Sequence, residues 1–346
     1  MASWDPSSLP VRPGVYVRFL EAARAIIGGE RGVVAIPLLA YDGGTAAAST
    51  VYEVESESDA IDLFGAVNVR SIRLALQAGA SKVVVYTLPE AAATEDYAAM
   101  RTALDAYDFN VFVFDGEYNE SEQTAAIAWA KNNRDLGKHF FVVIGGDAAA
   151  DADPTEGNSR STTAADDYVV NVITGGIADG VAYTSAQYAP YIAGLIAGTP
   201  LNDSVTYDVV TLDDVNRRLT LSEQDDAILD GSLALINDGE KVKVLSGVTT
   251  AGSKIRAIRV RQAVATDIAR TGADAYIGRI NNDATGRAAL ISAILAYMET
   301  LEAAGALQDP IVTLDPDNPP VGDSVFLLVS YVETDSIERI FLTVSI

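Results

Sequence analysis

The chain has 346 residues, of which 49% are hydrophobic, 48 are acidic and 24 are basic, so that its formal net charge is −24. It has no cysteine and one histidine, His139, which excludes disulfides, zinc–thiolate sites, thiol nucleophiles and histidine-rich metal sites. Such a polyanion is a poor ligand for nucleic acid or for an anionic membrane surface, and no apolar run approaches the roughly eighteen residues of a membrane span.

The first twenty residues have the composition of an extended arm. Pro6, Pro10 and Pro13 oppose a regular helix, and "GVYVRFL" (residues 14–20) then predicts a strand. The opening "MASWDPSSLPVRPG" lacks the basic start and the apolar core of a signal peptide. We therefore expect a soluble protein that is not exported through such a signal.

Helices and strands alternate over the next part of the chain. Buried strands are predicted at residues 31–41, 81–88, 109–116 and 138–146. Helices are predicted between them, at residues 56–65, 69–80, 94–107 and 119–137. Short apolar strands separated by helices indicate an α/β layer with parallel strand pairing.

The middle of the chain is less regular. Residues 147–166 are rich in Ala, Asp, Ser and Thr and predict a surface loop, and a strand at 169–173 and a helix at 185–198 follow. Residues 204–250 mix short strands and turns, and "IRAIRVR" (255–261) is compatible with either a strand or a helix. Helical patterns return at residues 265–278 and, most clearly, at 285–304, where Gly305 is a natural terminator.

The last forty residues contain two strand-like runs. A Pro- and Asp-rich loop is predicted at residues 308–323, followed by strands at 324–332 and 340–346. In the final run the apolar residues Ile340, Leu342, Val344 and Ile346 alternate with Phe341, Thr343 and Ser345. An apolar strand on an open sheet edge recruits other chains, so this run favours a protein that assembles with other chains.

No motif in the sequence assembles a catalytic site. "GGIADG" (175–180) is a broken dinucleotide loop, better explained as a glycine-rich turn. "DAAADADPTEG" (147–157) lacks the spacing of a calcium loop and is better explained as a solvated acidic loop. His139 is the only histidine and stands at the start of a predicted strand, so it is better explained as a structural residue. We therefore expect no enzyme activity, no cofactor and no bound metal.

Positive charge is concentrated near residue 270. Residues 254–287 contain seven basic and three acidic residues, a local charge of +4 that leaves −28 for the rest of the chain. The stretch is either a chance cluster on a solvated face or a contact surface for an acidic partner. The candidate contact residues are Lys254, Arg256, Arg259, Arg270 and Arg279.

Several long segments resemble the contractile tail sheath proteins of bacteriophages and phage-tail-like bacteriocins. They are "VRPGVYVRF" followed by "RGVVAIPLL", "GASKVVVYTL", "DAYIGRINNDATGRAALISAILAYMETLEAAGAL" and the closing "DSVFLLVSYVETDSIERIFLTVSI". The resemblance implies an α/β (α+β) fold with three parts: an N-terminal linking arm (1–20), an outer α/β layered domain (21–250) and a smaller C-terminal α+β domain ending in a linking strand (251–346). The chain is shorter than many members of the family, so large outward-facing additions are not expected.

The resemblance also implies a mechanical function. Many copies would form a helical homopolymer around a tail tube protein, bounded by baseplate and tail terminator proteins, in a virion tail assembled in the bacterial host cytoplasm. Contraction would drive the tube through a bacterial envelope without a cofactor, nucleic acid or membrane insertion. The matching linkage residues are Val15, Tyr16, Val17, Phe19, Ile340, Phe341, Leu342, Thr343 and Val344, and the basic stretch would face the tube. The alternatives are the sheath of a bacteriocin particle or a secretion system, and a Rossmann-like enzyme with an unrecognised site.

Overall fold

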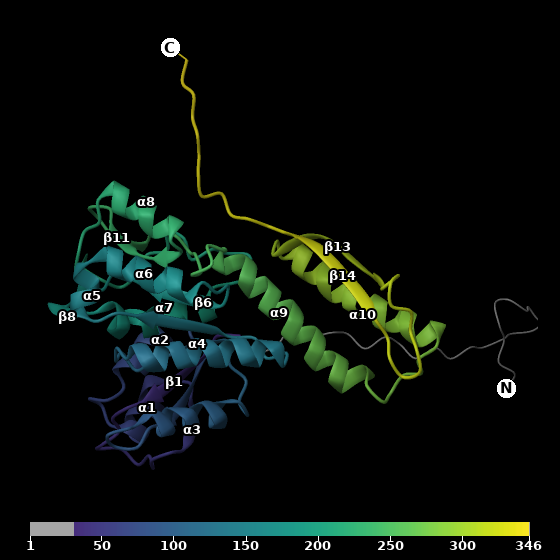
Figure 1. Cartoon of the computed structure of the whole chain (residues 1–346), viewed down its shortest axis with the longest axis horizontal. Coiled ribbons are helices and arrows are strands. Elements are labelled where there is room, and N and C mark those ends of the chain that lie inside the picture. Colours follow the sequence, from purple (N-terminus) through teal and green to yellow (C-terminus); the bar gives the residue numbers. More distant parts are fainter. Residues whose placement is uncertain (1–30, 346) are drawn as a thin grey trace, which may run out of the picture.

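The computed structural model describes residues 31–345 of the chain. A mostly parallel sheet forms the centre of the larger of its two domains (Figure 1). The sheet has seven strands in the order β10-β6-β5-β4-β1-β3-β2, and β2 alone runs antiparallel to its neighbour. The strands are β1 (Val33–Leu38), β2 (Val51–Val54), β3 (Lys82–Thr87), β4 (Val111–Val113), β5 (Phe141–Gly145), β6 (Val169–Val172) and β10 (Ser232–Leu233).

Helices cover both faces of this sheet, which explains why most of its strand residues are apolar. In β1, Val34 and Ile36 point into one core and Val33 and Ala35 into the other, because successive side chains alternate between faces. The first core is closed by α1 (Glu57–Phe64), α2 (Arg70–Gln77) and α7 (Ser185–Gly198), and the second by α3 (Thr94–Leu104) and α4 (Glu120–Asp135). The predicted α/β layer with parallel pairing is confirmed.

The helices of the first core pack closely because α7 carries glycine where it meets α2. A Cβ atom at Gly194 would lie 2.1 Å from the carbonyl oxygen of Ala75. Any larger residue would therefore push α7 away from α2 and open the core beneath them.

Residues 147–166 were expected to be a loop, and this expectation is wrong. They form α5 (Ala148–Ala152) and α6 (Pro154–Ala164). The Asp147 carboxylate accepts hydrogen bonds from the backbone N–H groups of Ala149 and Ala150, and Asp153 accepts one from Thr155. The aspartates and Pro154 that suggested a loop are thus the signals that begin two short helices.

A lobe of short elements follows the main sheet, as the mixed pattern of residues 204–250 predicted. Its strands pair in a three-stranded sheet, β8-β7-β9, and in the hairpin β11-β12. The elements are β7 (Gly176–Ala178), β8 (Val181–Tyr183), β9 (Asp214–Val215), α8 (Leu221–Leu229), β11 (Leu235–Asn237) and β12 (Val242–Val244).

One long helix joins the α/β body to the smaller domain (Figure 1). This helix, α9 (Ile255–Thr271), includes the segment whose pattern left strand and helix open. Its first turns place Ile255 and Ile258 in the core of the body, and its later turns place Val260 and Val264 in the core of the smaller domain. A π-helical turn (Gly272–Tyr276) and α10 (Ala284–Ala303) complete the helical part of that domain.

The smaller domain ends in a hairpin that differs from the predicted one. Residues 308–323 were expected to be a loop, but β13 (Leu307–Leu314) occupies the first half of that range and pairs antiparallel with β14 (Leu327–Glu333). The register shifts between Gln308 and Ile311, which accommodates Pro310 at an irregularity in the ladder. Within residues 31–345, no helix is both long enough and apolar enough to cross a membrane.

Candidate assembly surfaces

The segment after β14 carries apolar side chains into solvent. After β14 the chain contacts the α/β body through Glu338 and then runs away from both domains, and none of residues 334–345 is assigned to a strand (Figure 1). The exposed fractions of its large apolar side chains are 87% for Ile337, 75% for Ile340, 89% for Phe341, 84% for Leu342 and 81% for Val344. We call residues 334–345 the C-terminal arm. Its strand-like alternation has no pairing partner within the described part of the chain.

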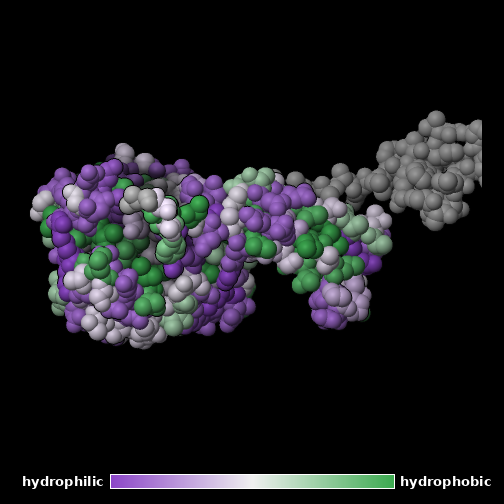
Figure 2. All heavy atoms as spheres, turned by 90° about the horizontal axis from the view of Figure 1, so that it is seen from above, coloured by the Kyte–Doolittle hydropathy of each residue, from purple (hydrophilic) through white to green (hydrophobic). Residues whose placement is uncertain are grey.

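The hairpin β13–β14 is a second incompletely covered surface. Val312 and Leu307 pack on α10, and Val329 and Tyr331 lie against the same core. The opposite face exposes the large apolar residues Ile311, Phe326, Leu328 and Val332, which are 41–55% exposed. Figure 2 shows apolar surface on the smaller domain. Because the sheet has only two strands, each strand also has one edge without a ladder partner in residues 31–345.

The two arginines at the centre of the expected basic surface are buried. Arg256 is 6% exposed, and its Nη2 donates to the carbonyl oxygen of Gly305 at 2.9 Å. Arg259 is 5% exposed, and its guanidinium donates to the carbonyl oxygens of Thr199 and Pro200. The expectation that these two residues present charge to a partner is therefore wrong, because the chain's own carbonyl groups and helices enclose them.

The other basic residues of the stretch divide into paired and exposed ones. Lys254 forms an ion pair with Glu338 at the root of the C-terminal arm. Arg270 lies 4.0 Å from Asp267, with 42% of its side chain exposed, and Arg279 is exposed on the turn before α10. Of the five candidates, Arg270 and Arg279 are therefore the two with exposed side chains.

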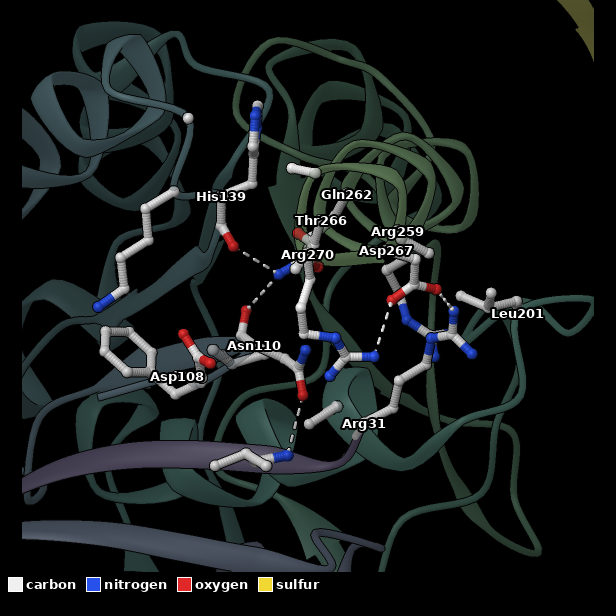
Figure 3. Close-up of a pocket in the computed structure, with 18 of the residues that line it drawn as sticks. Arg31, Asp108, Asn110, His139, Leu201, Arg259, Gln262, Thr266, Asp267 and Arg270 are labelled. Carbon is white, nitrogen blue, oxygen red and sulfur yellow. Dashed lines mark hydrogen bonds and ion pairs between the residues drawn. The ribbon is translucent and has the colours of Figure 1, made fainter. Parts of the chain in front are cut away.

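A pocket lies where α9 crosses the beginnings of β1, β4 and β5 (Figure 3). Gln262 bridges the junction, since its Nε2 donates to the carbonyl oxygens of Asn110 at 3.1 Å and His139 at 2.9 Å. Arg31 pairs with Asp267 at 2.7 Å, and the Tyr297 hydroxyl donates to the same carboxylate. These contacts join the two domains, which is a structural task.

His139 contributes its backbone, rather than its ring, to this junction. Its ring centroid lies 5.7 Å from that of Tyr168, and burial, followed by the positive charge of Arg134, lowers the pKa of the imidazole. Among residues 31–345 no group of three or more His, Cys, Asp or Glu side chains is arranged to hold a metal. The acidic stretch at 147–157 instead supplies helix caps and the buried Asp151, which accepts hydrogen bonds from Ser185.

A layered α/β body, a small α+β domain and an exposed apolar arm together describe a subunit built to join other chains. Two family models match the sequence: the phage tail sheath protein central domain over residues 90–250 and the phage tail sheath C-terminal domain over residues 248–346. The chain belongs to the phage tail sheath family, as its sequence resemblance predicted.

Known proteins agree with this assignment. The tail sheath protein of Clostridium phage phiCD119 is 23% identical over 233 residues, which cover 64% of this chain and 60% of that protein. The sheath tail protein from Desulfitobacterium hafniense has a TM-score of 0.73 at 20% identity, covering 92% of this chain and all of that one. The helical sheath of the anti-feeding prophage in its contracted state has a TM-score of 0.74 at 16% identity, covering 97% and 99%. At these identities the structural matches establish the fold.

Proposed function

We propose that this chain is the structural subunit of a contractile tail sheath, a helical sleeve that surrounds an inner tube and contracts to drive it through a bacterial envelope. The observation that carries the proposal is the C-terminal arm, whose apolar side chains are exposed in a chain of the sheath family. A protein that kept such a segment in solvent would be prone to aggregation, whereas a polymer covers it.

The arm would link subunits by adding a strand to a neighbour's sheet. The open edges of β13 and β14 offer unpaired backbone groups, and the alternating apolar residues of positions 340–345 would fix the register. Residues Val15, Tyr16, Val17 and Phe19, which we expect to form the second linkage, lie outside the described residues. Because the C-terminal link would be an extended arm, bodies could rotate and slide against one another without losing connection.

The partners follow from this role. We propose further copies of the chain, a tail tube protein, and baseplate and tail terminator proteins at the two ends of the sleeve, assembled in the cytoplasm of a bacterial host. No catalytic step, cofactor, nucleic acid or membrane insertion is part of the proposal. The energy for contraction would come from the difference in free energy between two arrangements of the subunits. A sleeve assembled in the less stable arrangement can change to the more stable one but does not return.

Removal of residues 340–346 tests the linkage. We expect the truncated chain to remain a folded monomer with a free energy of unfolding within about 0.5 kcal/mol of the intact chain, because these exposed side chains contribute little to the core. Negative-stain microscopy should show no tubes or rings. Leu136→Ser is the matched control, since Leu136 is 86% exposed on the α/β body and its loss should leave sleeves intact.

Two results would contradict the linkage. Loss of the cooperative melt on truncation would place the strand in the subunit's own core, and normal sleeves without residues 340–346 would show that the arm is dispensable.

The kind of particle is a separate question. The curated relative is a phage tail sheath protein, while one structural neighbour is the PVC sheath complex of an extracellular contractile injection system in its contracted state. We propose a phage tail, with an injection particle as the alternative. Neighbouring genes for a capsid protein and a terminase would support a phage tail. Neighbouring toxin genes without capsid or terminase genes would support an injection particle.

A further inference from the structure

The C-terminal arm has a competitor for its partner strand within its own chain. Only residues 334–339 separate the end of β14 from the apolar run that begins at Ile340. The free edge of β14 has no ladder partner among the described residues. A connection of six residues is long enough to reverse direction, so residues 340–345 could fold back as a third antiparallel strand on the edge that a neighbour's strand would use.

Such self-pairing would be favoured by proximity. A segment on a short flexible linker has an effective concentration on the order of millimolar at its own sheet edge. The entropic cost of closing a loop this short is also small. A second copy at micromolar concentration could not compete on equal terms, so the fold needs a feature that keeps the arm away from β14.

The side chain of Glu338 supplies contacts that hold the linker elsewhere. One carboxylate oxygen accepts a hydrogen bond from the Thr206 hydroxyl at 2.9 Å and lies 3.5 Å from the Ser204 hydroxyl. The other oxygen is paired with Lys254, the residue before the first turn of α9. Only 14% of the Glu338 side chain is exposed, in an arm whose neighbouring apolar side chains are mostly exposed.

The receiving groups belong to the α/β body and are themselves fixed. The Thr206 hydroxyl also accepts a hydrogen bond from the backbone N–H of Gly247 at 2.8 Å, so its proton is directed toward Glu338. Lys254 is held in a bridge with Val248. Charge-assisted hydrogen bonds to a partly buried carboxylate are among the stronger polar contacts in proteins. The linker is therefore bound at a built position on the body.

A second contact fixes the start of the linker. The Arg261 guanidinium on α9 donates through Nη2 to one oxygen of Glu333 at 3.1 Å and through Nε to the other. Between Glu333 and Glu338 the chain thus follows α9 toward the body, and the arm then leaves the molecule at the junction of the two domains (Figure 1). This course leads away from the edge of β14.

We propose that Glu338 is a positioning residue that binds the linker to the α/β body and so prevents the chain's own apolar strand from occupying the edge of β14. The proposal rests on the proposed function, because it concerns the strand that would link subunits. It adds that the monomer is kept competent for assembly by an internal contact.

Hydrogen exchange of the monomer, measured by mass spectrometry at a concentration too low for assembly, tests the proposal. In the intact chain we expect residues 340–345 to exchange at unprotected rates. In Glu338→Ala we expect about tenfold protection of these amides and of the β14 edge, the change expected for losing one charge-assisted contact. The rate of sleeve formation, followed by light scattering, should fall by a similar factor.

Two further variants make the result specific. Asp317→Asn removes the charge of an exposed acid in the loop between β13 and β14, so exchange and assembly should match the intact chain. The charge swap Glu338→Lys with Lys254→Glu should restore rapid exchange and rapid assembly, since the pair is re-formed with opposite signs.

Unchanged exchange in Glu338→Ala would overturn the proposal, whether or not its assembly is slowed, because a slow variant without self-pairing would mean that Glu338 acts between subunits. If the intact chain forms no sleeves, the proposed function fails, while the exchange measurement on the monomer still decides the role of Glu338.

Discussion

The sheets of the α/β body and of the smaller domain differ in how much of their surface is covered by the rest of the chain. The seven-stranded sheet of the body is covered by helices on both faces, and β1 is buried along its whole length. The two-stranded sheet of the smaller domain is covered on one face only, and large apolar side chains such as Leu328 remain 52% exposed on the other. The sheet of the body is thus fully covered by its own chain, whereas within residues 31–345 the hairpin of the smaller domain leaves a face and two edges open, as the proposed linkage requires.

The distribution of charge follows the same division. Residues 31–250 contain 13 basic and 33 acidic residues, whereas residues 251–346 contain 8 and 12. Identical bodies with a charge of −20 repel one another, and the smaller domain with a charge of −4 does so far less. Close contact between copies is therefore favoured at the smaller domains, where the arm and the open hairpin lie.

The two regions are nevertheless joined firmly. Besides its apolar residues, α9 carries four buried polar side chains. Arg256, Arg259 and Gln262 donate hydrogen bonds to backbone carbonyl groups of other segments, and Asp267 pairs with Arg31. Unpairing such buried groups is costly, so movements of the body are transmitted to the smaller domain.

The largest expected effect comes from opening the core of either region. Met100 in α3 and Met298 in α10 are both fully buried, one in each domain. Met100→Ala and Met298→Ala should each lower the free energy of unfolding by about 2–5 kcal/mol. Because α9 belongs to both cores, we expect a single cooperative transition. Urea titration followed by Trp129 fluorescence, in a Trp4→Phe background, measures it.

The position of Trp129 in the body makes this comparison decisive. Met298→Ala should shift the Trp129 transition although it lies in the other domain, whereas Met100→Leu and Met298→Leu, which conserve volume, should cost less than about 1.5 kcal/mol. If Met298→Ala changed the helical signal but left the Trp129 transition in place, the two domains would be independent folding units.

A smaller effect is expected from an acidic group of the body. Burial, followed by the negative charge of Asp115, raises the pKa of Glu117 from 4.5 to about 8, and the Tyr97 hydroxyl donates to its carboxylate at 3.3 Å. A raised pKa means that the unfolded chain releases this proton first, so stability is lost as the pH rises from about 4.5 toward 8.

Glu117→Gln should therefore stabilise the protein by about 1–3 kcal/mol at pH 8.5 and by little at pH 4.5. Urea titrations at both pH values measure the difference, with the exposed Glu90→Gln as control. An equal gain at both pH values would show that the amide improves packing and that the proton is not involved.

The smallest effects on stability concern the exposed arginines of the smaller domain. Arg270→Glu and Arg279→Glu should change the free energy of unfolding by about 0–1 kcal/mol each, as exposed charges do. If these residues face an acidic tube, the double variant should assemble poorly around tubes while still forming tube-free sleeves, and the defect should be greatest at low salt. Arg218→Glu, on the body and 61% exposed, is the control. Equal assembly of both forms at low and moderate salt would remove this stretch from the tube surface.

Local sequence patterns predicted most of the body. Its helices form their hydrogen bonds within a few residues of sequence, and its strands are buried by helices that follow them closely in the chain. The periodicity of residues 31–146 was enough to place β1, β3, β4 and β5 and the helices between them. Composition misled at residues 147–166, where Asp147 and Asp153 look like loop residues until their carboxylates are seen to cap α5 and α6. The same residue types serve both purposes, and only the backbone geometry separates them.

By itself the sequence determined the α/β class and the family, and it predicted that the alternating apolar run at residues 340–346 links subunits. Tertiary structure decided what depends on distant segments: that β14 pairs with β13 rather than with the final run, that α9 joins two cores, and that Arg256 and Arg259 are enclosed by carbonyl groups. The physical reason is the range of the interactions. Helical hydrogen bonds reach four residues along the chain, whereas strand partners and the burial of a charge are set by segments with no fixed distance in sequence.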